Sequence, residues 1–292
     1  MYEPLVSIIT PTKNIVEFNK TADFNTLVYL LQAQTYNNIE HFVIDGASTD
    51  TTLNLLKDYK NAGHITFYSE ADRGKFDAYN KALLRVQGKY VAFISCDDFY
   101  HDLTGIMDVV NLMEKEEADY CFFSSYCRHP SGYIFLFTPA FLNTFQVCPC
   151  PRQAIMFKKS VLDELRGFDE KFKLMADYDL VIRMVMSKYK GVFFDGNIMT
   201  CRLGENTTKN PTQANAETSH IFYKNYKPLF PLTDEMLTRM VEISEMPRGL
   251  VEKLAEAFPQ DKELFFKRYE FMYNMRRNAK IERDKAAKNG SK

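Results

Sequence analysis

The first half of the chain repeats one pattern, an apolar run followed by a polar loop and then apolar residues at helical spacing. The run at 5–9 is rich in β-branched residues, and apolar positions at helical spacing follow at 24–31. The same pattern predicts strands at 41–45, 65–69 and 90–95, with helices at 51–59 and 76–86. Strands that alternate with helices are typical of an α/β fold with a mostly parallel sheet.

The pattern becomes less regular after 90–95. A helix at 103–117 and a strand at 120–124 continue it, but 126–152 is rich in Pro and aromatic residues, which predicts hairpins and a loop. Short helices are expected after Ser160 and at 177–189, and the chain reads as helical from about 215 onward. We therefore expect an α/β domain at 1–227 and a helical region at 228–292.

Composition limits the class of protein. With 46% hydrophobic residues, 292 residues are enough for a large core, and six scattered cysteines suggest reduced thiols rather than a disulfide scaffold. The N-terminus does not resemble a secretory signal, and no apolar segment approaches the ~20 residues of a membrane span. These features predict a cytoplasmic protein whose membrane contact, if it has any, is peripheral.

Charge is distributed unevenly. Residues 262–292 carry ten Lys or Arg against four Asp or Glu, which leaves 27 against 34 in the rest of the chain. A basic surface is thus confined to the tail, and no nucleic-acid partner is expected. Gly74 and Gly88 are isolated, so the glycine-rich phosphate loop of kinases and dehydrogenases is absent.

Carboxylates follow three of the first four predicted strands. Ligands of parallel sheets bind at the carboxyl ends of the strands, so these groups are expected to meet at one edge. They are Asp45, Glu70, Asp72, Asp97 and Asp98. Adjacent carboxylates at the end of a buried strand favour a cation, and oxygen ligands favour Mg²⁺ or Mn²⁺. The alternative interpretation of Asp97–Asp98 is a helix cap.

Asp45 and two further acids have both a structural and a functional interpretation. Asp45 precedes a polar turn and is placed to accept hydrogen bonds from a base or ribose, while Ser48, Thr49 or Asp50 is expected to cap the next helix. Asp177 and Asp179 lie in the first turn of a helix, where negative charge suits the helix dipole. Simple helix stabilisation is the structural interpretation of both.

Five blocks in order resemble the family 2 glycosyltransferases of the GT-A fold, over roughly the first 210 residues. The blocks are VSIITPTKN at 6–14, VIDGASTDTT at 43–52, SEADRGKFDAYNKAL at 69–83, FISCDD at 93–98 and RGFDEKFKLMADYDLVIR at 166–183. The second block is similar to that of bacterial polysaccharide and O-antigen enzymes.

The resemblance implies a role for each matching residue. A nucleotide-sugar donor would contact Thr10, Pro11, Thr12, Asn14, Asp45, Asp72, Arg73 and Asp97. Among these, Asp72 and Arg73 would border the ribose and diphosphate. Asp98 would hold Mn²⁺ or Mg²⁺, Asp177 would be the catalytic base, and Asp179 would begin the pair that follows it.

The chain departs from the family pattern at two places. Gly46 stands where many members have a second Asp, which weakens the expected base contact and the preference for uracil. Arg152 and Gln153 stand where relatives often have His-Gln on the acceptor side.

The implied reaction is a single displacement with inversion, from a nucleotide sugar (UDP-linked by the resemblance) to a hydroxyl of a glycan or lipid-linked acceptor. A metal would stabilise the leaving diphosphate, and a carboxylate would take the proton of the hydroxyl. The alternatives are a sugar nucleotidyltransferase, which should have a glycine-rich loop after the first strand, and a non-catalytic nucleotide-sugar binding module, which would need no acceptor-side acid such as Asp177.

The tail is expected to form an amphipathic helix at 264–285. Phe265, Tyr269, Met272 and Met275 recur at spacings of three and four and so share a face, with basic residues away from it. This face is suited either to an anionic membrane surface or to packing on protein, and the sequence leaves both open.

Overall fold

The computed structural model describes residues 3–204, 206–257 and 262–289, and their contacts divide the chain into two compact units. The first unit comprises Met1–Pro139 and Cys150–Glu205, and the second comprises Ala140–Pro149 and Asn206–Lys292.

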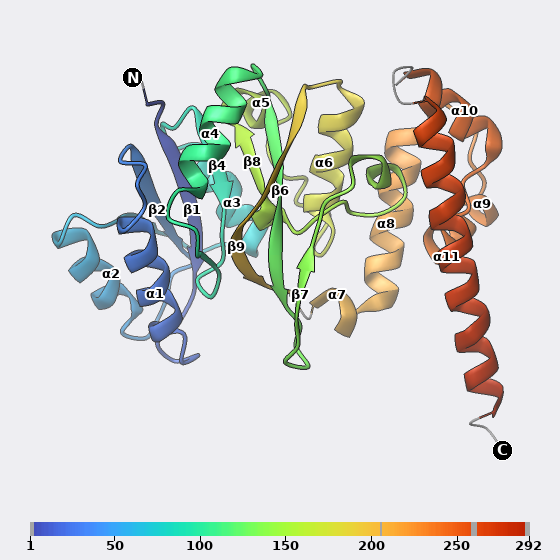
Figure 1. Ribbon diagram of the computed structural model, residues 1–292. Helices are drawn as coiled ribbons and strands as arrows, with labels where there is room; N and C mark the ends of the chain where they lie inside the picture. The colour runs from blue at the N-terminus through green and yellow to red at the C-terminus, as the bar shows by residue number, and fades with distance from the viewer. Residues whose placement is uncertain (1–2, 205, 258–261, 290–292) are drawn as a thin grey trace. The chain divides into compact units, whose positions relative to one another are not determined.

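The first unit is built on one mixed sheet with helices packed along it (Figure 1). Its strands are β1 Val6–Thr12, β2 Ile39–Asp45, β3 Thr66–Ser69, β4 Tyr90–Phe93, β5 Phe99–Tyr100, β6 Tyr120–Arg128, β7 Ile134–Phe137, β8 Ile155–Lys158 and β9 Gly191–Arg202. The strand order is β3-β2-β1-β4-β8-β6-β9-β5, and β7 pairs with β6.

The predicted strand and helix pairs form the parallel half of this sheet. β1 pairs in parallel with β2 and β4, and β2 pairs in parallel with β3. The helices of the unit are α1 Thr21–Gln32, α2 Thr52–Asn61, α3 Lys75–Leu83, α4 Gly105–Lys115, α5 Lys159–Glu164 and α6 Ala176–Met186, with a 3-10 turn, η2, at Arg152–Ala154. The expected α/β architecture is confirmed, and the carboxyl ends of β1, β2 and β3 lie side by side.

The remaining strands make the sheet mixed. β8 is antiparallel to both β4 and β6, whereas β9 runs parallel to β6. β9 is not among the strands expected from the sequence, because Asp195 and Gly196 interrupt its apolar pattern like a turn. In the structure these two residues form a bulge: Phe123 pairs with Phe194, but Ser124 pairs with Asn197.

One polar pair lies inside the parallel half. The Thr10 hydroxyl and His41 Nε2 are 3.0 Å apart, and both residues are buried. Burial lowers the pKa of His41 to about 3, so the imidazole is neutral at physiological pH. Thr10 was predicted to contact the donor, whereas here its side chain bonds to a neighbouring strand.

The second unit is helical. Its helices are α7 Asn206–Lys209, α8 Pro211–Tyr226, α9 Asp234–Ile243, α10 Arg248–Ala257 and α11 Lys262–Asn289, with a 3-10 turn, η1, at Phe141–Phe145. We expected the helical region to start near residue 228, but α8 already belongs to this unit because its apolar face packs there. The hydroxyl of Tyr226, for example, donates to the Phe145 carbonyl at 2.9 Å.

The predicted C-terminal helix is present as α11. Phe265 and Met272 are buried, the Phe265 ring lies 5.2 Å from that of Phe145, and the Tyr269 hydroxyl donates to the Met246 carbonyl. The stripe therefore packs on protein within its own unit, except for Met275, which is exposed. Among the described residues, no helix is both long and apolar enough to cross a bilayer.

Candidate active site at the strand ends

Asp45, at the end of β2, organises the loop that follows it. Its carboxylate accepts hydrogen bonds from the Thr12 hydroxyl at 3.1 Å, from the Ser48 N–H and hydroxyl at 2.9 and 2.5 Å, and from the Ser69 hydroxyl at 2.7 Å. The side chain is fully buried. Its predicted contact with a base or ribose stays a prediction, and the role visible in the structure is to join the ends of β1, β2 and β3.

Asn14 fastens the loop after β1 to the loop after β2. Its backbone N–H donates to the Ser48 hydroxyl at 2.8 Å, and its side-chain oxygen accepts from the Thr49 N–H at 2.8 Å. Of the predicted capping residues, Asp50 accepts the Thr52 N–H at the start of α2. Pro11 and Thr12 end β1 beside these loops. The predicted nucleoside residues therefore form one connected edge.

The paired acids after β4 have different environments. Asp98 is fully buried, and its carboxylate accepts N–H groups from Ser95 at 3.0 Å, Gln153 at 2.9 Å and Arg202 at 2.6 Å. Burial raises the pKa of Asp98, although these donors oppose the shift. Asp97 accepts only through Oδ2, and Oδ1 has no partner among the described residues. Asp97 is also buried, but it has the one carboxylate oxygen of the pair that lacks a partner among the described residues.

Three cations surround Asp97, and none of them was among the site residues expected from the sequence. Lys20 Nζ lies 2.6 Å from Asp97 Oδ2, Arg202 Nη1 lies 3.8 Å from the same oxygen, and Arg128 donates to the Asp97 carbonyl. Burial opposes the charge of Lys20, but the pairing with Asp97 outweighs it and raises the pKa of the amine. A prediction of β9 as a strand ending at Arg202 would have pointed to one member of this group, whereas Lys20 and Arg128 lie on other segments.

The predicted acceptor-side residues connect the paired acids to the predicted base. Gln153 bonds to Asp98, while the guanidinium of its neighbour Arg152 lies 3.4 Å from Asp177 Oδ2 and 3.0 Å from the Tyr79 hydroxyl. Arg152 is buried, with its guanidinium over the Tyr79 ring. A continuous row of side chains thus runs from the end of β4 to the start of α6.

The two acids in the first turn of α6 have opposite surroundings. The Asp177 side chain is 22% exposed, and Oδ1 accepts the N–H of Tyr178. Asp179 is fully buried and accepts from Arg183 Nε at 2.7 Å, while the same guanidinium donates to the carbonyls of Leu165 and Gly167. Asp177 is thus the accessible carboxylate, and Asp179 fixes the turn before α6.

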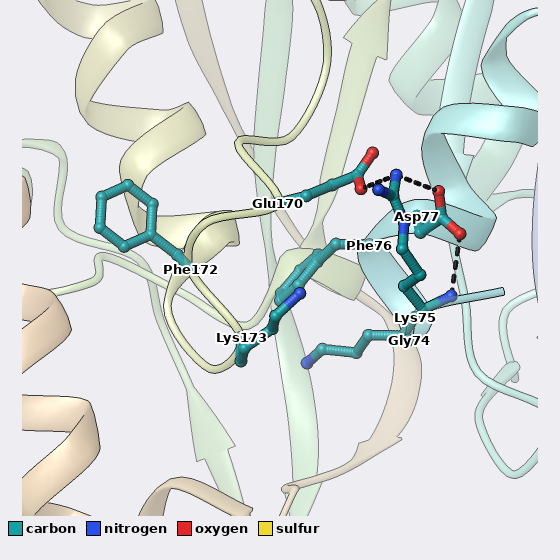
Figure 2. A pocket seen from close by; sticks show the side chains of 8 residues that line it. Gly74, Lys75, Phe76, Asp77, Glu170, Phe172 and Lys173 are labelled. Carbon is teal, nitrogen blue, oxygen red and sulfur yellow. Dashed lines mark hydrogen bonds and ion pairs between the residues drawn. The ribbon is translucent and has the colours of Figure 1, made fainter.

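Arg73 follows β3 and borders a small pocket (Figure 2). Its guanidinium bridges Asp77 at 3.1 Å and Glu170 at 2.6 Å. Hydrogen bonds from Arg73 and Lys81 outweigh burial and lower the pKa of Asp77 to about 2. Figure 2 shows the side chains of Lys75 and Lys173 approaching this pocket from α3 and from the 169–175 loop respectively.

The sequence is similar to bacterial glycosyltransferases. It is 28% identical over 217 residues to an uncharacterised glycosyltransferase of Rickettsia prowazekii (68% of this chain, 64% of that protein). It is also 36% identical over 100 residues to the putative teichuronic acid biosynthesis glycosyltransferase TuaG of Bacillus subtilis (33% and 37%). The chain thus spans just under two thirds of the length of the Rickettsia relative.

Solved structures share the fold. Residues 1–349 of Staphylococcus aureus TarS, in complex with UDP-GlcNAc, match with a TM-score of 0.60 at 15% identity, covering 94% of this chain and 92% of that one. The mannosyltransferase PcManGT of Pyrobaculum calidifontis, in complex with GDP-Man and Mn²⁺, matches with a TM-score of 0.59 at 17% identity (94% and 85%). The expected GT-A fold is confirmed.

The family model described as glycosyl transferase family 2 matches residues 7–166, more than half of the chain. The matched range contains the strand-end acids and the Arg152–Gln153 turn described above. This chain therefore belongs to glycosyl transferase family 2.

Proposed function

We propose that this protein is an inverting glycosyltransferase that moves a hexosyl or N-acetylhexosaminyl group from a UDP-sugar to a hydroxyl of a glycan or lipid-linked saccharide. Its place would be bacterial surface polysaccharide synthesis, including lipopolysaccharide. Family membership supports the reaction class, and the UDP-GlcNAc complex of TarS and the name of TuaG support the donor and the process.

The observation that carries this proposal is the position of Asp177. Its partly exposed carboxylate is connected through Arg152 and Gln153 to the acids at the end of β4. A transferase needs an acceptor-side base close to a donor site, and a binding module or a nucleotidyltransferase has no use for such a base. The arrangement therefore favours transfer to a hydroxyl.

In the proposed reaction, the acceptor oxygen forms a bond to the anomeric carbon while the bond from that carbon to the diphosphate breaks. Asp177 takes the proton of the hydroxyl, and the buried Arg152 holds the carboxylate in place. Lys20 and Arg202, beside Asp97, would offset the charge of the departing diphosphate. One base without a protein nucleophile gives inversion.

We also propose that a divalent ion takes part, held by the Asp97–Asp98 pair as the sequence predicts. Among the described residues, no three His, Cys, Asp or Glu side chains are grouped to hold a metal. Mg²⁺ and Mn²⁺ on a nucleotide need only one or two carboxylates, with phosphates and water as the other ligands. The unpartnered Oδ1 of Asp97 fits that need, and the ion would supply positive charge at the diphosphate.

Finally, we propose that the enzyme works at the cytoplasmic face of the membrane through α11. The predicted stripe packs within the second unit, but a different face of the helix is exposed. On that face, Leu264, Phe271 and Met275 are 52%, 55% and 46% exposed, and Lys267 and Arg268 flank them. An apolar stripe beside basic residues suits an anionic lipid surface.

The test combines donor binding with turnover. UDP-sugars and GDP-mannose are screened for thermal stabilisation with Mn²⁺, because a bound donor raises the melting temperature. Transfer from the best donor is then measured for the parent and for Asp177→Asn, which we expect to bind the donor normally but to lose at least ~100-fold in turnover.

Asp163→Asn is the matched control, because Asp163 is an exposed acid of α5 that pairs with Lys159 outside the site. Near-normal turnover in Asp177→Asn would remove Asp177 as the base and leave Asp179 as the first alternative. Absence of stabilisation by any nucleotide sugar would contradict the proposed function itself.

A further inference from the structure

The turn after β2 has a space that another residue fills. A Cβ built on Gly46 would lie 2.2 Å from Asp72 Oδ2 and 3.4 Å from Lys13 Cδ. Gly46 does not have a positive φ, so its backbone would accept other residues, and the Asp72 carboxylate occupies the place that a side chain would take. Gly46 and Asp72 therefore complement each other. Gly46 has no side chain, and the carboxylate of Asp72 lies where the Gly46 side chain would be.

Asp72 is held in this position from one side. Its Oδ1 accepts the N–H of Gly74 at 2.9 Å, and Gly74 has a φ of 128°, a conformation that side chains rarely adopt. Oδ2 accepts no hydrogen bond from the described residues, and Asp72 is only half-buried. The loop thus holds Oδ2 of Asp72 beside the backbone of Gly46. This oxygen can accept a hydrogen bond from a ligand.

Asp45 does not compete for this role. It directly precedes Gly46, but its carboxylate is fully buried and accepts four hydrogen bonds from Thr12, Ser48 and Ser69. Of the two acids beside Gly46, Asp72 is consequently the one with capacity for a ligand, while Glu70, which follows β3, is paired with Arg85.

A carboxylate oxygen accepts hydrogen bonds and donates none, so it discriminates among bases. Uracil carries a ring N–H at N3, whereas cytosine has a bare nitrogen there, whose lone pair a carboxylate repels. Guanine and adenine differ in the same way at N1. The side chain of Lys13, which has no ion pair among the described residues, also lies close to Gly46, and its amine can donate a hydrogen bond to a base carbonyl.

We propose that Asp72, placed over Gly46, selects the nucleobase of the donor and takes bases that carry a ring N–H. This inference rests on the proposed function, in which the base is uracil. It assigns to Asp72 a role different from the ribose and diphosphate contact implied by the family resemblance, and it explains how the chain compensates for the absence of an acid at residue 46.

The test compares UDP with CDP by isothermal titration calorimetry, because these ligands differ only at the base edge. The parent should bind UDP at least about tenfold more tightly than CDP, the value of one hydrogen bond to a charged group. Asp72→Asn replaces the carboxylate by an amide, which can also donate a hydrogen bond. The ratio of UDP affinity to CDP affinity should therefore fall at least about tenfold. Asp163→Asn, which removes the charge of an exposed acid of α5 outside the site, should leave the preference unchanged.

A swap provides the second variant. Gly46→Asp alone should weaken UDP binding, because the new side chain meets Asp72. Gly46→Asp combined with Asp72→Ala returns one carboxylate to the space and should restore most of the preference for UDP. Circular dichroism confirms that each variant is folded before its affinities are compared.

An unchanged ratio of UDP to CDP affinity in folded Asp72→Asn would overturn the proposal, as would a parent that binds both equally. A parent that prefers GDP to UDP would contradict the uridine donor of the proposed function, but not the role of Asp72. GDP and ADP then replace UDP and CDP as the test pair, with the same expected and overturning results.

Discussion

At the residue scale, the acids at the strand ends look alike in the sequence but have three different environments. Asp45 is saturated by hydrogen bonds from the protein, Asp98 is buried against N–H donors, and Asp97 combines an ion pair with an unpartnered oxygen. Burying a carboxylate is costly unless donors satisfy it, so Asp45, which hydrogen bonds saturate, is part of the scaffold, while Asp98 adds its charge beside Asp97 to the proposed metal site. Asp97 and Asp72 each keep one carboxylate oxygen without a partner among the described residues, and that oxygen is left to meet a ligand.

The metal proposal gives a prediction at this scale. Mn²⁺ should increase the affinity for UDP in the parent, and Asp98→Asn and Asp97→Asn should each lose that increase, because each removes negative charge from the proposed site. Titration of UDP with Mn²⁺ or with EDTA measures the effect. An increase in Asp98→Asn equal to that of the parent would remove Asp98 as a ligand, and equal increases in all three proteins would contradict the metal site.

At the scale of elements, the first turn of α6 separates two functions over three residues. Asp177 faces Arg152 and is partly exposed, whereas Asp179 faces Arg183 inside the unit. Arg183 in turn binds the carbonyls of Leu165 and Gly167, which connects α6 to the end of α5. One helix turn can hold both a partly exposed acid and a buried acid, because the side chains of residues i and i+2 point in different directions.

We therefore expect Asp179→Asn to lower the free energy of unfolding by about 3 kcal/mol, because breaking a buried ion pair leaves the remaining charge without its partner. Asp177→Asn should change it by less than about 1 kcal/mol, because its carboxylate is partly solvated. Chemical denaturation of both variants measures the difference. Equal stabilities for the two variants would show that Asp179 does not hold the turn.

At the scale of the whole molecule, α11 presents two apolar faces with different uses. The face with Phe265 and Met272 is buried within the helical unit, and the Arg276 guanidinium on the same side donates to the Val241 carbonyl. The face with Leu264, Phe271 and Met275 is exposed and remains available to a partner.

Substitution of Leu264, Phe271 and Met275 by Ser should lower binding to anionic vesicles at least about tenfold, through loss of buried apolar area, with little effect on folding. Sedimentation with vesicles of phosphatidylcholine and phosphatidylglycerol measures it, with pure phosphatidylcholine as the lipid control. Ile281→Ser is the protein control, because Ile281 is exposed on another side of the helix. Equal partitioning of the parent and the triple variant would contradict the membrane role.

The local sequence was sufficient for much of the fold. Periodicity located the strands and helices of the parallel half, because side-chain spacing of two or about 3.6 residues is a property of the single element. It failed at β9, where Asp195 and Gly196 form a bulge, since a bulge and a turn have the same composition. Alternation of strands and helices then implied that the acids after β2, β3 and β4 share one edge.

Tertiary structure decided which side chains surround those acids. Lys20 and Arg202 reach Asp97 from far along the chain, Arg152 turns inward to Asp177, and Asp72 occupies the space left by Gly46. The sequence by itself thus determined the family, the sheet edge and the candidate acids, because these depend on local pattern. The role of each acid depends on burial and on long-range partners, which only the packed chain fixes.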